Sequence, residues 1–235
     1  MSKIIFITGT DTGVGKTLLT GLLLVHLREL GKRALAIKPF CTGGRADAEL
    51  LYSLQGGELT LDQINPFYFP EPLAPLVAAR IHRRSISLAG VLQHIQQLQR
   101  LHPTPDPRHS TLLIEGAGGL LVPLGEGYTW ANVLKKLACR VIVVSANRLG
   151  TINHTLLTVG ALQAVDIKEL SVVMMRVMTP GCSTPDTRRN PGVLAELLAP
   201  VPIHQIPFLG PNAPQPGTLK KNQKKIKKVL ARILA

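Results

Sequence analysis

Short apolar runs along the chain alternate with longer stretches in which apolar residues recur at helical spacing. The short runs are rich in β-branched residues and apolar at successive positions, which is typical of buried strands. Such strands must be covered on both faces, as in a parallel sheet flanked by helices. The predicted strands are Lys3–Ile7, Arg33–Lys38, Thr111–Glu115, Arg140–Ser145, Leu170–Val177 and Pro202–Ile206.

The stretches between the strands have leucine at three- and four-residue intervals and predict helices. Strand and helix alternate from end to end, which predicts one doubly wound α/β domain with a mainly parallel sheet over residues 1–219. We expect a connector at Leu101–Arg108 and a mobile loop at Thr179–Pro191, where proline, glycine and serine cluster. The predicted helices are Lys16–Leu30, Ala46–Leu54, Ser87–Leu98, Trp130–Leu137, Thr151–Val165 and Gly192–Leu198.

The composition is that of a globular protein from a reducing compartment. Hydrophobic residues make up 45% and charged residues 17%, so the chain buries a core instead of remaining disordered. Cys41, Cys139 and Cys182 lie far apart, which argues against a disulfide framework or a structural zinc site. The first residues have no signal-peptide pattern, and no apolar run is long enough to span a membrane. We expect a cytoplasmic protein.

The net charge of +13 is unevenly distributed. Residues 220–235 hold six lysines, one arginine and no acid, so the rest of the chain carries only +6. That moderate charge weakens the case for nucleic acid, and no nucleic-acid partner is expected. The tail has apolar residues at helical spacing and predicts a basic amphipathic helix. It either packs its apolar stripe on the body or contacts an anionic membrane or nucleic acid.

The most specific motif is Gly9-Thr10-Asp11-Thr12-Gly13-Val14-Gly15-Lys16-Thr17, between the first predicted strand and helix. Its glycines let backbone N–H groups approach a polyphosphate, Lys16 can reach the β- and γ-phosphates, and the Thr17 hydroxyl can bind Mg²⁺. Five residues separate Gly9 from Gly15, one more than in the general pattern, so the match is to the Gly-Lys-Thr end. The motif predicts a P-loop NTPase-like fold, but many reactions share it.

Charged residues end two other predicted strands. Ligands of an open α/β sheet bind beyond the carboxyl ends of its strands. Lys38 therefore either faces the γ-phosphate or simply reaches solvent, and Thr42 beyond it can bond a substrate. Glu115 follows four apolar residues and is either the second Mg²⁺ ligand or a buried structural carboxylate. Asp47 opens a predicted helix, where it either adds a metal-binding oxygen or stabilises the first turn; the residues alone favour the second role.

Glycines follow Glu115 in Gly116-Ala117-Gly118-Gly119 and allow close approach of phosphate or substrate. This segment is not the dinucleotide-binding pattern, because Leu121 takes the sixth position and the segment follows a later strand. Gly150-Thr151-Ile152-Asn153-His154 starts another predicted helix. Thr151 can cap this helix, and the N–H groups of its first turn can bind a carboxylate. His154 is interpreted as a partly buried helix residue without a catalytic role.

Taken in order, these motifs resemble the dethiobiotin synthetase family, P-loop enzymes of biotin synthesis. The resemblance runs from the first strand to about Leu209. Asn65-Pro66, with Glu71-Pro72 and Ala74-Pro75, is also similar to the family's connecting segment. A single Gly-Lys-Thr is common, whereas the ordered set is specific. The motifs are Gly9-Thr10-Asp11-Thr12-x-Val14-Gly15-Lys16-Thr17, Lys38-Pro39, Glu115-Gly116-Ala117-Gly118-Gly119 and Gly150-x-Ile152-Asn153-His154.

The resemblance implies an ATP-dependent ligase that acts on diaminopelargonic acid and CO₂. CO₂ adds to one amine as a carbamate, ATP phosphorylates the carbamate, and the second amine closes the ureido ring with release of phosphate. Lys16 and Lys38 would neutralise the charge of the carbamate and the γ-phosphate. Thr17, Asp47 and Glu115 would hold Mg²⁺, which revises the interpretation of Asp47 toward a metal ligand.

The resemblance also implies a homodimer, in which the helix start at Gly150–Asn153 takes the substrate carboxylate across the interface. The implied substrate-binding residues are Thr12, Thr42, Gly150, Thr151, Ile152 and Asn153. The implied nucleotide-binding residues are Gly13, Val14, Gly15, Lys16, Thr17, Leu18, Asp47, Glu115, Gly116, Ala117, Gly118, Arg176, Val177, Pro207, Phe208 and Leu209.

One departure lies where the family reads adenine. The family usually places an Asn there, in a segment like Ala-Asn-x-x-Thr-Pro, whereas this chain has Met175-Arg176-Val177-Met178-Thr179-Pro180. A guanidinium only donates hydrogen bonds and cannot accept the adenine amino proton. We therefore predict a weakened preference for ATP over CTP or GTP. Pro207-Phe208-Leu209 matches the family's base-side loop, so a base pocket is expected to remain.

The alternative function is that of a cell-division or plasmid-partition ATPase of the same superfamily. Such a switch would use the basic tail on membrane or DNA. These proteins carry an additional signature lysine a few residues before Gly-Lys-Thr, where this chain has Asp11, Thr12 and Gly13. They also lack the Lys38-Pro39 and Ile152-Asn153-His154 motifs. The residues favour the synthetase.

Overall fold

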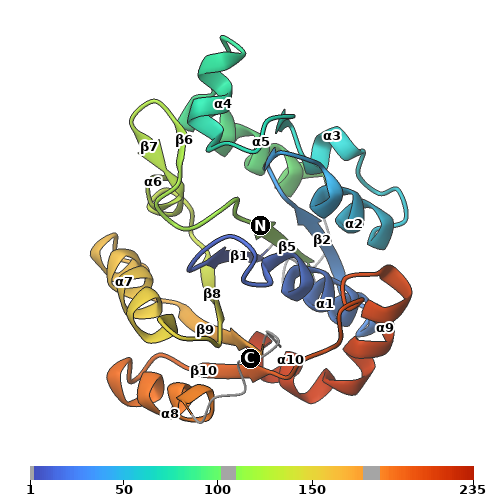
Figure 1. The fold of residues 1–235 in the computed structure, drawn as a ribbon. Coiled ribbons are helices and arrows are strands. Elements are labelled where there is room, and N and C mark those ends of the chain that lie inside the picture. Colours follow the sequence, from blue (N-terminus) through green and yellow to red (C-terminus); the bar gives the residue numbers. More distant parts are fainter. Residues whose placement is uncertain (1–2, 102–109, 177–185) are drawn as a thin grey trace.

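The computed structural model describes residues 3–101, 110–176 and 186–235. Its main feature is a six-stranded sheet in the order β10-β9-β8-β1-β5-β2 (Figure 1). Every neighbouring pair in this sheet is parallel, which confirms the predicted α/β fold. The strands are β1 (Lys3–Gly9), β2 (Arg33–Ile37), β5 (Ser110–Glu115), β8 (Arg140–Ala146), β9 (Leu170–Met175) and β10 (Ile203–Ile206).

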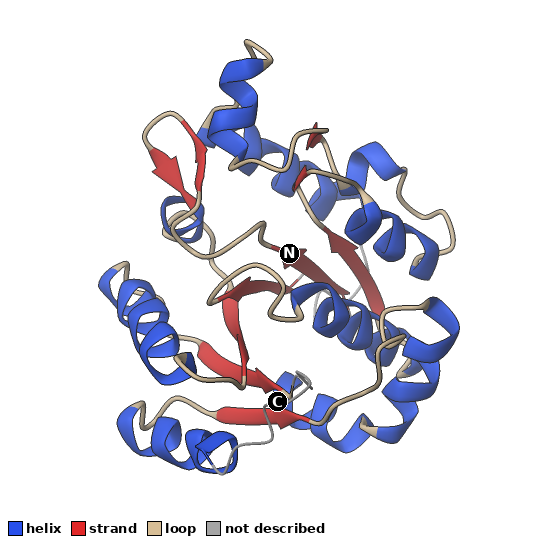
Figure 2. Ribbon diagram, viewed as in Figure 1, coloured by secondary structure: helices blue, strands red, loops and turns tan. Residues whose placement is uncertain are grey.

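Helices cover the sheet on both sides, as its apolar strands require (Figure 2). Figure 1 shows α1 and α9 on one side of the sheet and α7 and α8 on the other. The longer helices are α1 (Lys16–Glu29), α2 (Ala46–Leu54), α5 (Leu88–Leu101), α7 (Thr151–Ala164), α8 (Asp186–Leu197), α9 (Pro216–Lys225) and α10 (Lys227–Leu234). No helix in the described ranges is long and apolar enough to cross a membrane.

The sheet register brings two predicted motifs to the same edge. β1 lies between β5 and β8, with Ile7 opposite Glu115 and Gly9 opposite Val144. The P-loop therefore leaves β1 directly beside the glycine-rich segment that leaves β5. The Trp130 ring packs beneath that segment, 5.0 Å from Phe6 between ring centroids, and is fully buried.

Several short elements were not predicted, because two to seven residues are too few to establish a hydrophobic period. Beyond Lys38, where no strand was predicted, lies β3 (Phe40–Thr42), which pairs with β4 (Phe67–Phe69). A second small sheet joins β6 (Pro123–Gly125) to β7 (Tyr128–Thr129). Two short helices, α3 (Leu61–Ile64) and α4 (Pro75–Ile81), were also not predicted. The helix predicted at Trp130–Leu137 is present as α6 (Trp130–Leu134) and ends before Leu137.

The predicted mobile loop at Thr179–Pro191 is wrong in its second half. Residues 177–185 and 102–109 lie outside the described residues, but α8 begins at Asp186 and includes Pro191. Pro191 cannot donate to the carbonyl of Thr187 four residues before it. That carbonyl instead accepts a hydrogen bond of 2.7 Å from Asn147 Nδ2. Pro191 is buried on the same helix face as Leu194, so packing and an outside donor together keep the proline in the helix.

The basic tail forms two helices instead of the single one predicted, and α9 crosses the predicted boundary at residue 219. Leu219, Ile226, Leu230 and Ile233 are buried, and α9 packs on α1 and α2 while α10 packs on β10. The apolar stripe therefore lies on the body, as in the first of the two alternatives. The six tail lysines are exposed, and contact with an anionic surface stays an untested prediction.

Candidate active site

The P-loop joins the end of β1 to the start of α1. Gly13 and Gly15 have positive φ angles of 70° and 102°, which L side chains rarely adopt. A Cβ on Gly15 would also lie 3.2 Å from the Met175 side chain. Gly15 is the N-cap of α1, without a side-chain cap and without an acid in the first turn. The first turn of α1 thus brings no acid of its own to the loop, and the N–H groups at this helix start suit a phosphate.

Lys16, the first residue of α1, points back over the loop. Its Nζ donates a hydrogen bond of 2.7 Å to the carbonyl of Asp11, and the residue is only 6% exposed. Burial lowers the pKa of Lys16 to about 8, against the opposing effect of the Glu115 carboxylate. An anion bound at this end of the loop would favour the protonated, positively charged form of the Lys16 amine.

Lys38 lies directly after β2 and meets two carboxylates. Its Nζ donates a hydrogen bond of 2.8 Å to Glu115 Oε1, at the end of the neighbouring strand β5. It also forms an ion pair with Asp47 from the first turn of α2. Burial lowers the pKa of Lys38, but the Glu115 and Asp47 charges outweigh burial and raise the pKa above its ordinary value. Lys38 therefore does not simply reach solvent.

Glu115 connects this cluster to the P-loop. Its Oε1 accepts a hydrogen bond of 2.6 Å from the Thr17 hydroxyl as well as the one from Lys38. The residue is fully buried, and its Oε2 has no hydrogen-bond partner among the described residues. A buried carboxylate oxygen without a partner is costly unless a ligand satisfies it. The hydrogen bonds of Glu115 to Thr17 and Lys38 thus leave its Oε2 available to a ligand.

The segment after Glu115 is held in place from both sides. The Gly116 N–H donates to the carbonyl of Ile7 at 2.9 Å, and Trp130 Nε1 donates to the carbonyl of Ala117 at 3.1 Å. Gly118 has a φ of 60°. The backbone of this turn is therefore fixed beside the P-loop by β1 and α6.

A cleft of about 580 Å³ lies over these groups. It brings together predicted residues from the P-loop, β2, α2 and β5, namely Thr12, Gly13, Gly15, Lys16, Thr17, Leu18, Lys38, Asp47, Glu115 and Gly118. Its walls also include Ala46, Leu50, Pro214 and Gln215, which sequence reasoning missed. Pro214 and Gln215 follow the predicted Pro207-Phe208-Leu209 segment by a few residues, but no local signal marked them. A second cavity of about 510 Å³, at the opposite end of the strands near Lys3 and Cys139, contains no predicted site residue.

The turn before α7 is near the P-loop but does not line this cleft. Arg148 and Asp11 form an ion pair of 3.5 Å that joins the two loops. The prediction that Thr151 caps α7 is wrong: Gly150 is the N-cap, with a φ of 85°. The Thr151 hydroxyl is buried and lies 2.6 Å from Ser145 Oγ. Ile152 is half-buried and Asn153 is exposed, as is His154, which was predicted to be partly buried.

The predicted base-side residues lie apart from the phosphate cleft. Arg176 is exposed and follows β9, with its N–H bonded to the carbonyl of Ile206 at 2.9 Å. It lines a separate cavity of about 540 Å³ together with Pro207. Phe208 is 39% exposed, and the Leu209 carbonyl accepts a hydrogen bond from Asn222. Val177 lies outside the described residues, and Val14, Ala117 and Thr42 are not among the residues that line either cavity.

Solved structures with this fold include cell division and plasmid partition proteins. The chain superposes on the MinC:MinD cell division protein complex of Aquifex aeolicus with a TM-score of 0.62 and 15% identity, covering 99% of this chain and 96% of that one. A putative plasmid partition protein of Borrelia burgdorferi, bound to AMPPNP, gives a TM-score of 0.62 and 11% identity over 100% and 99% of the two chains. At such identities the likeness concerns the fold alone.

Sequence comparison is more specific. A family model described as an AAA domain matches residues 3–210. The ATP-dependent dethiobiotin synthetase BioD of Anaeromyxobacter sp. is 38% identical over 208 residues, which cover 86% of this chain and 88% of that protein. The protein of that name from Bacillus subtilis strain 168 is 34% identical over 203 residues, covering 84% of each chain. With its P-loop, its Lys38–Glu115–Asp47 cluster and this degree of identity over most of its length, the chain belongs to the dethiobiotin synthetase family.

Proposed function

We propose that this chain is an ATP-dependent dethiobiotin synthetase. The observation that carries the proposal is the Lys38–Glu115–Asp47 cluster, which faces the same cleft as Lys16 and Thr17 of the P-loop. A nucleotide-binding loop by itself fits many reactions. A second buried lysine beside the γ-phosphate position adds a charge for an anionic acceptor, such as a carbamate.

The donor set fits a magnesium ion. The Thr17 hydroxyl, the Asp47 carboxylate and Glu115 are oxygen ligands, the type that Mg²⁺ prefers. The unpartnered Oε2 of Glu115 supports this fit, because a cation would satisfy it. When bound, the ion would offset the negative charge of the nucleotide phosphates. Thr17, Asp47 and Glu115 would hold it.

Lys16 and Lys38 are proposed to face different negatively charged groups. We infer that the P-loop N–H groups and Lys16 hold the β- and γ-phosphates of ATP, while Lys38 lies toward the carbamate formed from CO₂ and one amine of diaminopelargonic acid. A carbamate oxygen attacks the γ-phosphorus and ADP leaves. The second amine then attacks the carbonyl carbon, phosphate leaves and the ureido ring is closed. Lys16 and Lys38 oppose the negative charge that gathers between ATP and the carbamate, which is the main requirement of phosphoryl transfer.

The substrate site is proposed to be completed in a homodimer. Leu121, Leu149 and Leu157 are 62%, 93% and 65% exposed, and Leu121 and Leu157 line a cavity of about 380 Å³ beside Thr10. Exposed leucines next to the catalytic loop favour an interface between two copies. Thr12, Thr42 and the N–H groups at Gly150–Asn153 are the proposed contacts of the substrate. The cytoplasmic location stays a prediction.

The decisive assay measures ADP release from ATP with bicarbonate, in the presence and absence of diaminopelargonic acid. Substrate-dependent ADP release together with formation of dethiobiotin is the expected result. ATP hydrolysis that is indifferent to diaminopelargonic acid but responds to DNA or anionic vesicles would instead support the switch-type ATPase. In that case the exposed tail lysines would be the first residues to test.

A further inference from the structure

We propose that Asn65 is a positioning residue that holds Lys38 and the Asp47 helix in register for phosphoryl transfer. This inference rests on the proposed function of Lys38. Asn65 follows α3, is only 1% exposed and does not line the nucleotide cleft. It acts on the site through the backbone of Lys38.

The backbone of Lys38 lies just past the last paired residue of β2. The ladder between β2 and β5 ends with Ile37 opposite Ile114, and Pro39 has no N–H to extend it. Asn65 replaces the missing support. Its Nδ2 donates hydrogen bonds of 2.9 Å to the carbonyl of Lys38 and 3.2 Å to that of Pro39. The Lys38 N–H also donates to the carbonyl of Ile64, next to Asn65, at 3.0 Å.

Arg45 orients the Asn65 amide and connects it to Asp47. Arg45 Nε donates to Asn65 Oδ1 at 3.1 Å, and Arg45 Nη2 donates to the Asn65 carbonyl at 3.0 Å. Because the amide oxygen accepts from a guanidinium, the NH₂ group must face the carbonyls of Lys38 and Pro39. Arg45 immediately precedes α2, whose first turn carries Asp47. One buried amide thus joins the two elements that carry the Lys38–Asp47 ion pair.

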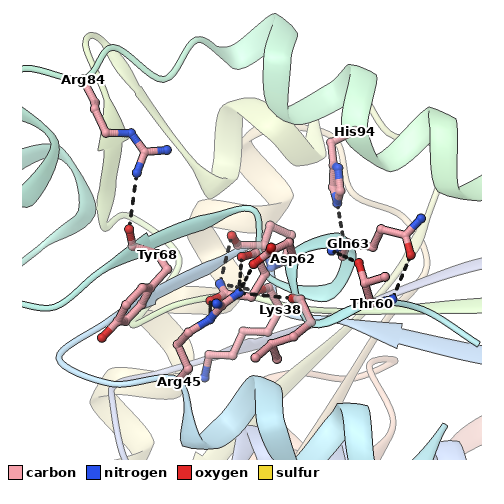
Figure 3. A network of polar contacts seen from close by, with 11 residues as sticks. Lys38, Arg45, Thr60, Asp62, Gln63, Tyr68, Arg84 and His94 are labelled. Carbon is pink, nitrogen blue, oxygen red and sulfur yellow. Dashed lines mark hydrogen bonds and ion pairs between the residues drawn. The ribbon is translucent and has the colours of Figure 1, made fainter. Parts of the chain in front are cut away.

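The surrounding contacts make this connection rigid. Figure 3 shows Arg45 beside Lys38, with Asp62, Gln63 and His94 extending the network toward α5. Arg45 Nη2 also bonds Asp62 at 2.8 Å, and its guanidinium lies 5.2 Å from the centre of the Tyr68 ring. His94 Nε2 lies 2.8 Å from the carbonyl of Gln63. Small displacements of reacting groups cost large factors in rate, so a rigid support of Lys38 has a direct catalytic consequence.

A control residue, Gln55 at the end of α2, bonds the strand that precedes Lys38. Gln55 is a second fully buried amide, and its Nε2 donates to the carbonyls of Ala36 and Leu51 at 2.9 and 3.1 Å. Gln55 therefore bonds β2 two residues before Lys38 but does not touch Lys38 itself. Asn65→Asp and Gln55→Glu each keep the side-chain size and remove the two donated bonds. The carboxylate introduced at position 65 would face the Arg45 guanidinium, whereas the one introduced at position 55 would face only the Ala36 N–H, so Gln55→Glu is the harsher change for stability.

The test compares kcat, KM for ATP and thermal stability of Asn65→Asp, Gln55→Glu and the wild type. We expect Asn65→Asp to lower kcat at least about tenfold with KM for ATP changed by no more than about twofold. Gln55→Glu is expected to lower the melting temperature at least as much as Asn65→Asp, but without that fall in kcat. Arg45→Lys, which keeps the charge but loses the planar fork, is a milder second variant. The kcat of Arg45→Lys is expected to lie between that of the wild type and that of Asn65→Asp.

A second readout does not depend on the reaction. The rate at which an acylating reagent modifies the Lys38 amine, followed by peptide mass spectrometry, reports how firmly Lys38 is held. This rate should rise at least about fivefold in Asn65→Asp and stay within about twofold of wild type in Gln55→Glu. Equal kcat and equal Lys38 modification in the two variants would overturn the positioning role. A wild type without substrate-dependent turnover would instead contradict the proposed function, and the modification rates would still decide whether Asn65 holds Lys38.

Discussion

Lys38 and Glu115 are each half of a buried ion pair, and neither is explained by stability alone. Lys38 is 7% exposed and Glu115 is fully buried. Desolvation of two such charges costs about as much as their attraction returns. The pair is arranged beside the P-loop, where a phosphate and a cation would each find an opposite charge. At the residue scale, the charges of Lys38 and Glu115 are opposite to those of the proposed ligands, a phosphate and a cation.

The role of Lys38 predicts a large loss of turnover in Lys38→Gln. The neutral amide removes the positive charge that is proposed to face the carbamate. It also leaves the buried Glu115 carboxylate without its cation, so the melting temperature is expected to fall as well. We expect kcat to fall at least about 100-fold, the order found when a charge-stabilising donor is removed. Steady-state ADP release and thermal denaturation measure the two effects. Lys135→Gln, at an exposed lysine of the body, is the control and should match the wild type.

Arg176 predicts relaxed nucleotide selection. Its side chain is exposed just after β9 and offers only donors, and the resemblance predicts that this position lies beside the base. The ratio of kcat/KM for ATP to that for GTP or CTP is expected to be below about 10. Arg176→Asn should raise this ratio, as measured by competition kinetics with the three nucleotides. Strict selection of ATP by the wild type would show that other groups read the base.

At the element scale, α9 braces the P-loop helix. Leu219 of α9 packs against Gly21 of α1, where an added Cβ would lie 2.7 Å from Leu219 Cδ1. Gln223 Nε2 lies 2.9 Å from the Nδ1 atom of His26, and both residues are buried. Asn222 bonds the Leu209 carbonyl at 3.1 Å. The C-terminal helices thus connect α1 to the segment that is proposed to face the base.

This packing predicts opposite effects of alanine at two helical glycines. Gly21→Ala gains helix propensity but crowds Leu219 and Leu54, so we expect the free energy of unfolding to fall by about 1 kcal/mol. Gly160→Ala, in α7, meets no atom within 4 Å of its new Cβ and should raise that free energy by about 0.5–1 kcal/mol. Chemical denaturation of both variants measures the difference. A stabilised Gly21→Ala protein would mean that α9 is not packed against α1 as described.

At the scale of the whole molecule, exposed leucines beside the P-loop predict a functional dimer. Leu149 is 93% exposed and lies between β8 and α7. Leu149→Asp should convert a dimer to a monomer and raise KM for diaminopelargonic acid more than KM for ATP. Light scattering after size exclusion and steady-state kinetics measure these effects. Leu197→Asp, at a 58% exposed leucine of α8, is the matched control and should leave the dimer intact.

The local features of this protein were accessible from its sequence. The six strands were predicted because short runs, most of them apolar, alternate with longer helical stretches. The P-loop was predicted because glycines, a lysine and a threonine stand at a characteristic spacing. Lys38 and Glu115 were found because a charge after an apolar strand is conspicuous. The short elements around Phe40–Thr42 and the helix through Pro191 were missed or misread, since neither leaves a periodic signal.

Only the tertiary structure decided which distant groups meet. The strand order puts β5 next to both β1 and β2, so Glu115 touches Thr17 and Lys38 across 98 and 77 residues of chain. Tertiary packing also places the Thr151 hydroxyl against Ser145. It brings Asn65 against the backbone of Lys38, and Gln215 into the wall of the cleft. The physical reason is that hydrophobic period and turn chemistry are local properties. A hydrogen bond between residues far apart depends on how complete elements pack, which no short stretch of sequence encodes.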